Sequence, residues 1–232
     1  MPDTFSASLT MAGIYFGIKY LYESKWIHLL TYFILSTLGV LSKIPALFLL
    51  SVFAVMIFDK QIAGSAKLYF MSASLLIIGI ASAWYFYWVP HLVENYHNKL
   101  YFPKPLMEGL KELIAQSSET AEKLYYSSLR SYAAFLLFLT GLFFMIIRKQ
   151  KFLLQTFLLL TGTFLFFMMK AGDVFSMHGY YIIPYTPVMA LCAGFTLGEI
   201  KNQKWYSVIL LIIATEAIAN QQHDFQIKES EK

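Results

Sequence analysis

The sequence predicts an all-α, polytopic integral membrane protein with about eight transmembrane helices, and three observations support this. First, 58% of the 232 residues are hydrophobic and only 14% are charged, whereas a soluble domain carries about 25% charged residues. Second, long apolar runs recur, and several contain no Asp, Glu, Lys or Arg. Third, stretches such as residues 75–80 are uniformly apolar, whereas strands of an outer-membrane barrel alternate. The composition excludes an ordinary soluble enzyme, a nucleic-acid-binding domain and a disordered chain.

The apolar runs are long enough to be membrane helices, which need about 20 mostly apolar residues, or somewhat fewer where their ends are anchored. The predicted spans cover residues 4–21, 27–41, 44–58, 68–89, 131–147, 152–169, 179–198 and 205–219. Only helices satisfy the backbone polar groups of such segments inside a bilayer. The chain therefore divides into a transmembrane domain over residues 1–220 and a polar C-terminal tail over residues 221–232.

Prolines mark two of these spans. Pro45 suits the first turn of the third span, where the missing N–H costs nothing. Pro184 and Pro187 lie inside the seventh span, where they remove helix hydrogen bonds and are expected to loosen or kink it.

One long connection, residues 90–130, separates the fourth and fifth spans. Pro103 and Pro105 interrupt it, and apolar residues then recur at helical spacing from Leu106 to Ile114. This spacing predicts a short amphipathic helix on the membrane surface, and Ser118 is expected to begin another helical turn. Such helices could form a lid over a lipid-linked substrate or serve only as a surface connector.

The short connections carry their cations asymmetrically, which predicts the orientation in the membrane. One side holds nine of them, against Lys43 and Lys170 on the other. The nine are Lys19, Lys25, Lys60, Lys67, Arg148, Lys149, Lys151, Lys201 and Lys204. Because cations favour the cytoplasmic side, we expect the long loop and both termini to lie outside a plasma (inner) membrane.

This orientation places the N-terminus outside, with no basic leader before the first span. Two readings follow: either the chain translocates a bare N-terminus, or it is the later part of a longer protein.

The expected outer face gathers the polar residues that could carry chemistry. Lys43, held by the turn before Pro45, is suited to a phosphate at headgroup depth, although a lysine there can also simply extend to the interface. His178, Tyr180 and Tyr181 could line a pocket at the same depth, or they could form an aromatic belt.

Signals for metals and for other chemistry are weak. His91, Glu94 and His97 are spaced three apart, but only two of them easily share one face, so a divalent metal is only a weak expectation and no other cofactor is expected. The single cysteine, Cys192, excludes a disulfide framework within the chain. No nucleotide-binding or zinc-protease motif occurs, and no charge lies in the middle of a span, which weakens the prediction of an ion-coupled transporter.

Four segments resemble a known family, and they occur in that family's order. Residues 1–5 (MPDTF) resemble a "PD" segment, residues 38–46 (LGVLSKIPA) a "GLxxLTKGP" turn, residues 83–85 (AWY) a "PWY" segment, and residues 178–191 (HGYYIIPYTPVMAL) an "HYxLPxxPALAL" span. Together they are similar to the membrane glycosyltransferases of the GT-C fold, among the relatives of protein O-mannosyltransferases and the lipid A aminoarabinose transferase. The family's glycine is Ile44 here, and its first "PWY" residue is Ala83.

The resemblance implies transfer of a sugar from a polyprenyl-phosphate donor to a lipid, glycan or protein acceptor on the outer face, with inversion at the anomeric carbon. Lys43, Tyr181 and His178 are then expected to bind the donor phosphate, and Asp3 is the matching catalytic carboxylate, in a supporting role. Family members carry their acidic motif in a large outer loop after the first span, and no such loop precedes Asp3. We therefore expect several spans and the principal catalytic acid to be missing from this chain, which alone would be inactive.

Two other classes of protein remain open from the sequence. A small polytopic transporter would show substrate uptake without an additional partner. A membrane assembly subunit without catalytic activity would co-purify with a second membrane protein and keep its function when Lys43 and His178 are replaced.

Overall fold

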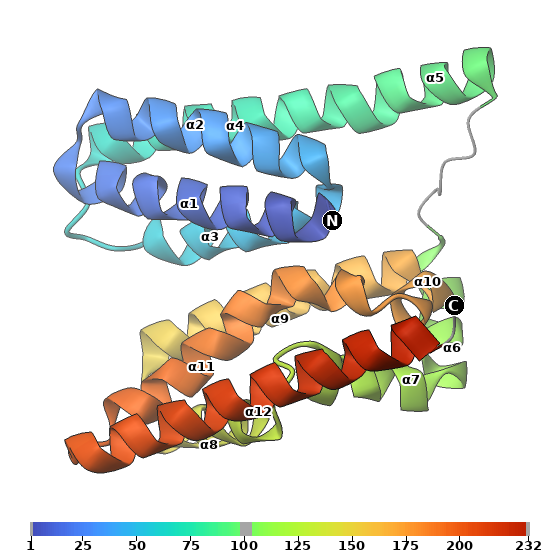
Figure 1. Ribbon diagram of the computed structural model, residues 1–232. Coiled ribbons are helices and arrows are strands. Elements are labelled where there is room, and N and C mark those ends of the chain that lie inside the picture. Colours follow the sequence, from blue (N-terminus) through green and yellow to red (C-terminus); the bar gives the residue numbers. More distant parts are fainter. Residues whose placement is uncertain (1, 98–103, 231–232) are drawn as a thin grey trace. The chain divides into compact units, whose positions relative to one another are not determined.

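The computed structural model describes residues 2–97 and 104–230, and these residues form helices and short connections with no strand (Figure 1). The all-α prediction is confirmed for this part of the chain. The chain divides into two compact units: unit 1 comprises Met1–Pro105 and Gly162–Lys170, and unit 2 comprises Leu106–Thr161 and Ala171–Lys232. The long helix α9 (Lys151–Ala171) contributes residues to both units.

Three helical segments in the described residues are long and apolar enough to cross a membrane: Gly64–Tyr96, Lys151–Ala171 and Gly179–Gly198. A fourth is added if the bent pair Ser117–Ser127 and Tyr132–Ile147, which meet at 93°, forms one span. Trp26–Ser42 and Ile44–Met56 are apolar but shorter. Every predicted span falls on a helix, but the number of eight spans stays a prediction because several of these helices are too short or too polar for this test.

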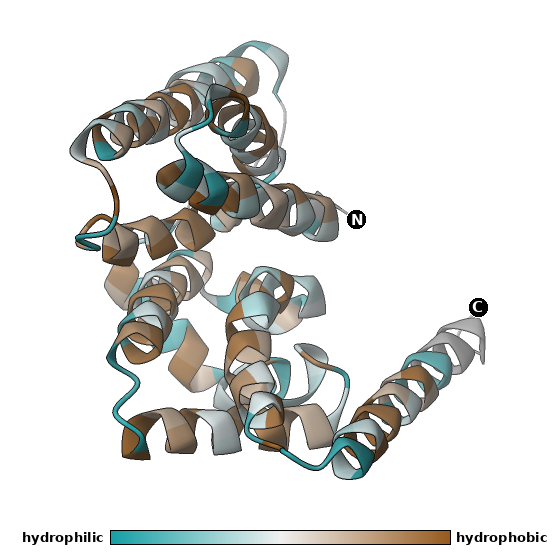
Figure 2. Cartoon of the chain, turned by 90° about the vertical axis from the view of Figure 1, so that its left-hand side faces the viewer, coloured by the Kyte–Doolittle hydropathy of each residue, from teal (hydrophilic) through white to brown (hydrophobic). Residues whose placement is uncertain are grey.

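The surfaces of the helices are apolar to an extent that is unusual for a soluble protein. Apolar residues follow the helices on many faces, and hydrophilic residues gather mostly at turns and helix ends (Figure 2). Leu75, Leu136 and Leu158 are each more than 60% exposed. Exposed apolar surface of this extent fits contact with lipid.

Unit 1 begins with an antiparallel pair of helices followed by shorter and longer helical segments. Its elements are α1 (Pro2–Glu23), α2 (Trp26–Ser42), the 3₁₀ helix η1 (Ile44–Ser51), α3 (Val52–Met56), α4 (Gly64–Ala83), the π-helical turn η2 (Trp84–Trp88) and α5 (Val89–Tyr96). Its core is aromatic: the ring of Tyr32 lies 4.6 Å from that of Phe70 and 5.4 Å from that of Phe53. Pro45 lies in the first turn of η1, as predicted.

Helices α1 and α2 approach each other closely through small residues. A Cβ atom added at Gly39 would overlap the Thr10 hydroxyl oxygen and lie 3.0 Å from the Thr10 backbone nitrogen. A Cβ at Gly13 would likewise overlap the hydroxyl of Ser36. Small residues at such contacts let two membrane helices pack backbone against backbone. This contact fixes the register between the start of α1 and the end of α2.

The helix at the fourth predicted span, residues 68–89, is longer than predicted and covers Gly64–Tyr96. Helical structure continues past Val89 and Pro90 to Tyr96, inside the predicted loop 90–130. The π-helical turn η2 ends two residues before Pro90, so the hydrogen-bond pattern of the helix already changes where the proline removes a donor. Residues 98–103 of the loop, including Pro103, lie outside the described residues.

Unit 2 contains the remaining loop helices and the C-terminal helices. Its elements are α6 (Leu106–Ala115), α7 (Ser117–Glu122), the π-helical turn η3 (Lys123–Ser127), α8 (Tyr132–Ile147), the first part of α9, α10 (Asp173–Met177), the 3₁₀ helix η4 (Gly179–Tyr185), α11 (Thr186–Gly198) and α12 (Gln203–Ser230). A helix forms where the amphipathic spacing predicted one. The segment that contains Pro184 is 3₁₀ rather than α-helical, in agreement with the predicted loosening.

Two contacts position the helices of unit 2. A Cβ at Gly141 of α8 would overlap the backbone carbonyl of Cys192 in α11, so these helices touch at a glycine. Glu216 of α12 accepts hydrogen bonds from the Ser131 hydroxyl (2.6 Å) and the Tyr132 backbone N–H (2.8 Å). This carboxylate thereby caps the first turn of α8. Helix α12 continues beyond the predicted end of the last span, through residues 221–230.

Candidate functional site

Lys43 lies at a sharp break between α2 and η1. Its backbone is extended, with φ −162° and ψ 120°, and it is the last residue before the 3₁₀ helix. Pro45 disfavours the α-helical backbone conformation at Ile44, the residue before it, and has no backbone N–H to donate. The α-helix therefore does not continue through this point. The break therefore follows from the sequence and displays the Lys43 side chain at a helix end.

Asp3 forms an ion pair with Lys43. Its Oδ1 lies 2.5 Å from the lysine Nζ, and the residue is 1% exposed, while the side chain of Lys43 is 19% exposed. Asp3 also lies in the first turn of α1, where the helix dipole favours a negative charge. A buried carboxylate needs such partners to remain charged. The structure thus brings together two of the residues predicted for the site.

Ser6 and Tyr85 support the same turn. The Ser6 hydroxyl is positioned by α1 to donate to the backbone carbonyls of Gly39 (2.6 Å) and Lys43 (3.2 Å). The Tyr85 hydroxyl lies 3.3 Å from the carbonyl oxygens of Val40 and Leu41. The sequence analysis did not identify Ser6. Asp3, Ser6 and Thr10 share one helical face, and this spacing could have indicated that Ser6 lies on the same side of α1 as Asp3.

An apolar cavity of about 430 Å³ lies within unit 1 along η1 and α3. Its lining includes Leu47, which is four residues after Lys43, together with Phe48, Phe70 and Phe166. The few polar groups in the lining are paired: the Tyr32 hydroxyl lies 2.8 Å from Ser74 Oγ. The cavity is therefore suited to a hydrocarbon chain rather than to a polar ligand.

His178 and Tyr181 lie in unit 2, at the start of η4. The ring of His178 stacks on those of Tyr180 (5.1 Å between centroids) and Tyr181 (6.2 Å), and the histidine is exposed. The Tyr181 backbone N–H donates to the His178 carbonyl. The four predicted site residues are thus joined as two pairs, Asp3 with Lys43 in unit 1 and His178 with Tyr181 in unit 2.

The predicted lid helix α6 is tied to the segment that leads to His178. The backbone N–H of Asp173, at the start of α10, donates to Oε2 of Glu112 in α6 (3.0 Å). The Ser176 hydroxyl of α10 also hydrogen-bonds the Gln116 side chain. These bonds hold α10 against the loop helices within unit 2.

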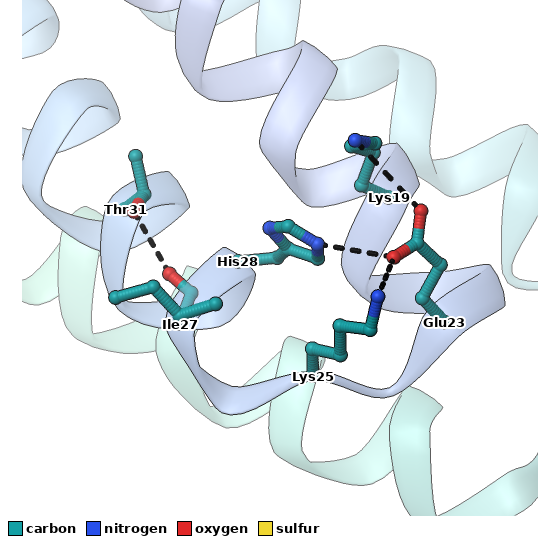
Figure 3. Close-up of polar contacts among 6 residues, drawn as sticks. All are labelled: Lys19, Glu23, Lys25, Ile27, His28 and Thr31. Atoms are coloured by element: carbon teal, nitrogen blue, oxygen red, sulfur yellow. Dashed lines mark hydrogen bonds and ion pairs between the residues drawn. The ribbon is translucent and has the colours of Figure 1, made fainter.

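A second polar cluster lies at the turn between α1 and α2 (Figure 3). Glu23 contacts Lys25 (2.9 Å), His28 (3.2 Å) and Lys19 (3.9 Å), and all three side chains point toward its carboxylate. Hydrogen bonds from Lys25 and then His28 hold the pKa of Glu23 below its ordinary value. Nearby, the Tyr22 hydroxyl donates to Asp59 (2.8 Å), and Lys67 donates to the Asp59 carbonyl.

The residues with weak metal-ligand spacing are not gathered into a site. His91 lies against Trp88 and Asn95, and His97 ends α5 in a left-handed conformation. Over residues 2–97 and 104–230, no three His, Cys, Asp or Glu side chains are grouped as metal ligands.

Comparison with known proteins adds no relative. No family model, no curated protein and no solved structure matches this chain.

Proposed function

We propose that this chain is part of a membrane glycosyltransferase that moves a sugar from a polyprenyl-phosphate donor to an acceptor on the outer face of the membrane. One observation carries the proposal: three of the four segments that resemble the GT-C family meet at one point in unit 1. Asp3 pairs with Lys43, and Tyr85 hydrogen-bonds the residues just before Lys43. A chance likeness of separate segments would not require them to converge.

Lys43 is the residue proposed to bind the donor phosphate. An ammonium group has three N–H donors, so it can contact a phosphate while it keeps its contact with Asp3. Charge-assisted hydrogen bonds to phosphate are strong, and they strengthen as the bond to the sugar breaks and charge builds on the departing phosphate. Lys43 would thereby stabilise the leaving group.

The cavity along η1 suits the prenyl chain of the same donor. Its lining includes Leu47, four residues after Lys43, and is almost wholly apolar. A volume of about 430 Å³ lies within the usual range for ligand sites, about 300–1,000 Å³. With the phosphate at Lys43, the hydrocarbon chain attached to it could lie along η1, as the covalent structure of a lipid phosphate requires.

Asp3 is proposed to orient Lys43 rather than to take a proton. Its carboxylate is buried and already neutralised by the lysine, whereas a general base must reach the acceptor hydroxyl. In the proposed reaction the acceptor oxygen attacks the anomeric carbon, its proton passes to a carboxylate, and the polyprenyl phosphate leaves with the electron pair of the broken C–O bond. The donor contacts of His178 and Tyr181 stay a prediction from the resemblance, and within unit 2 the rings of these two residues stack on each other.

The test is transfer of labelled sugar from a polyprenyl-phosphate donor in membranes that contain the full chain within its active assembly. Lys43→Ala should reduce the transfer rate at least a hundredfold, and Lys43→Arg should retain part of it. The matched control is Lys60→Ala, an exposed lysine in the turn after α3. Equal transfer by wild type and Lys43→Ala, at equal membrane levels, would remove the proposed role.

A further inference from the structure

A second apolar groove lies in unit 1, between α2 and α4. Its volume is about 590 Å³, and Leu30, Phe33 and Leu76 are among its lining residues. Leu30 and Leu76 are 54% and 60% exposed, so the groove is open at the surface of the helices rather than enclosed in the core of the unit. Its lining is apolar apart from a few polar atoms.

An aromatic pair lies at one end of this groove, where the lining segments of α2 and α4 begin. The rings of Trp26 and Tyr69 lie 4.9 Å apart, and both residues line the groove while remaining largely exposed. Trp and Tyr with this exposure are typical of the membrane–water interface, where the ring meets hydrocarbon on one side and headgroups on the other. The pair therefore marks the depth at which a lipid headgroup would begin.

Positive charge surrounds the same end of unit 1. Lys25 immediately precedes Trp26, and Lys67 lies two residues before Tyr69. Residues 19–28 and 59–69 hold four lysines, because Lys19 and Lys60 are also present, and only two carboxylates, Glu23 and Asp59. The Glu23 carboxylate is shared among Lys19, Lys25 and His28 (Figure 3). Lys67 donates its hydrogen bond to the Asp59 backbone carbonyl rather than to a carboxylate. This end of the unit therefore retains net positive charge.

We propose that this groove is a binding site for a phospholipid with an anionic headgroup. One acyl chain would lie between α2 and α4, beneath Trp26 and Tyr69, and the headgroup phosphate would lie against Lys25 and Lys67. Charge complementarity selects this occupant, because a lipid of net negative charge neutralises the excess positive charge at this end, whereas a zwitterionic lipid or an apolar protein helix brings no net negative charge. The site is separate from the proposed donor site, because Lys43 lies at the opposite end of α2, which spans 17 residues or about 25 Å.

Two variants separate the contribution of the headgroup from that of the acyl chain. The double variant Lys25→Gln/Lys67→Gln removes two charges and leaves the groove intact. Ser72→Trp fills the groove, since Ser72 is an exposed lining residue. Its matched control is Ala83→Trp, an exposed small residue about three turns along α4 on nearly the same face and outside the groove lining.

The experiment measures lipid bound to the purified full chain by native mass spectrometry, with equal amounts of phosphatidylglycerol and phosphatidylcholine of the same chains. Wild type should retain phosphatidylglycerol about tenfold more than phosphatidylcholine. The double variant should lose this preference, Ser72→Trp should lose the bound lipid, and Ala83→Trp should match wild type. Helix content by circular dichroism must stay unchanged in all variants.

Two outcomes would overturn the proposal: phosphatidylglycerol retention that is unchanged in the double variant, or retention that falls in Ala83→Trp as much as in Ser72→Trp. Lys43→Ala distinguishes this site from the donor site, because it should leave phosphatidylglycerol retention unchanged. If Lys43→Ala abolishes that retention, the anionic lipid binds at the other end of α2 and the proposal fails.

Discussion

The Asp3–Lys43 ion pair should make the two residues unequal in their contribution to stability. Asp3 is 1% exposed, whereas the side chain of Lys43 is 19% exposed at the end of a flexible stem. Lys43→Met leaves a buried carboxylate without its cation, which costs about 3–5 kcal/mol. Asp3→Asn leaves a lysine that can extend toward water, so we expect a smaller cost of about 1–2 kcal/mol.

A double-variant cycle tests this reasoning. The free energy of unfolding is measured in mixed micelles by circular dichroism for wild type, Asp3→Asn, Lys43→Met and the double variant. The double variant should be about as stable as Asp3→Asn and more stable than Lys43→Met, because removal of the carboxylate charge also removes the penalty of leaving it unpaired. Additive losses, or a Lys43→Met variant as stable as Asp3→Asn, would refute the reasoning.

Three further predictions concern packing, acid and capping. Gly39→Val should destabilise the α1–α2 pair by about 1–3 kcal/mol, seen as a lower thermal midpoint, because backbone atoms of α1 already touch this position. The backbone N–H of Gln61 and then the Tyr22 hydroxyl lower the pKa of Asp59. Its stabilising effect is therefore present at neutral pH and lost as the pH falls through that lowered pKa, so the difference in midpoint between wild type and Asp59→Asn should shrink below about pH 4. Glu216→Ala should expose the first-turn amides of α8 and speed their hydrogen exchange, whereas an unchanged rate would show that other groups cap this helix.

Much of the helical structure could be predicted because it depends on local composition. Uniform apolar runs must form helices in a bilayer, and Pro45 and Pro184 mark segments that are 3₁₀ rather than α-helical. The fourth predicted span ended at residue 89, just before Pro90, whereas the structure continues as helix α5 to Tyr96 after the π-helical turn η2. Whether a proline ends a helix depends on such a local adjustment, which periodicity does not reveal.

The candidate site was predictable only in part. Lys43 and Asp3 were identified singly, but their pairing depends on the close contact at Gly39, which sets the register of α1 against α2. Ser6 was missed because a serine in an apolar run reads as a small packing residue until its acceptor is known. The groove between α2 and α4 was also invisible, since it arises from the packing of segments about 40 residues apart.

The central claim is that Lys43 holds the phosphate of a polyprenyl-phosphate donor. The most direct measurement is the dissociation constant of undecaprenyl phosphate for the purified full chain, compared among wild type, Lys43→Ala, Lys43→Arg and Lys60→Ala. We expect Lys43→Ala to bind at least tenfold more weakly, Lys43→Arg to lie between, and Lys60→Ala to match wild type. Equal affinity in wild type and Lys43→Ala would contradict the account.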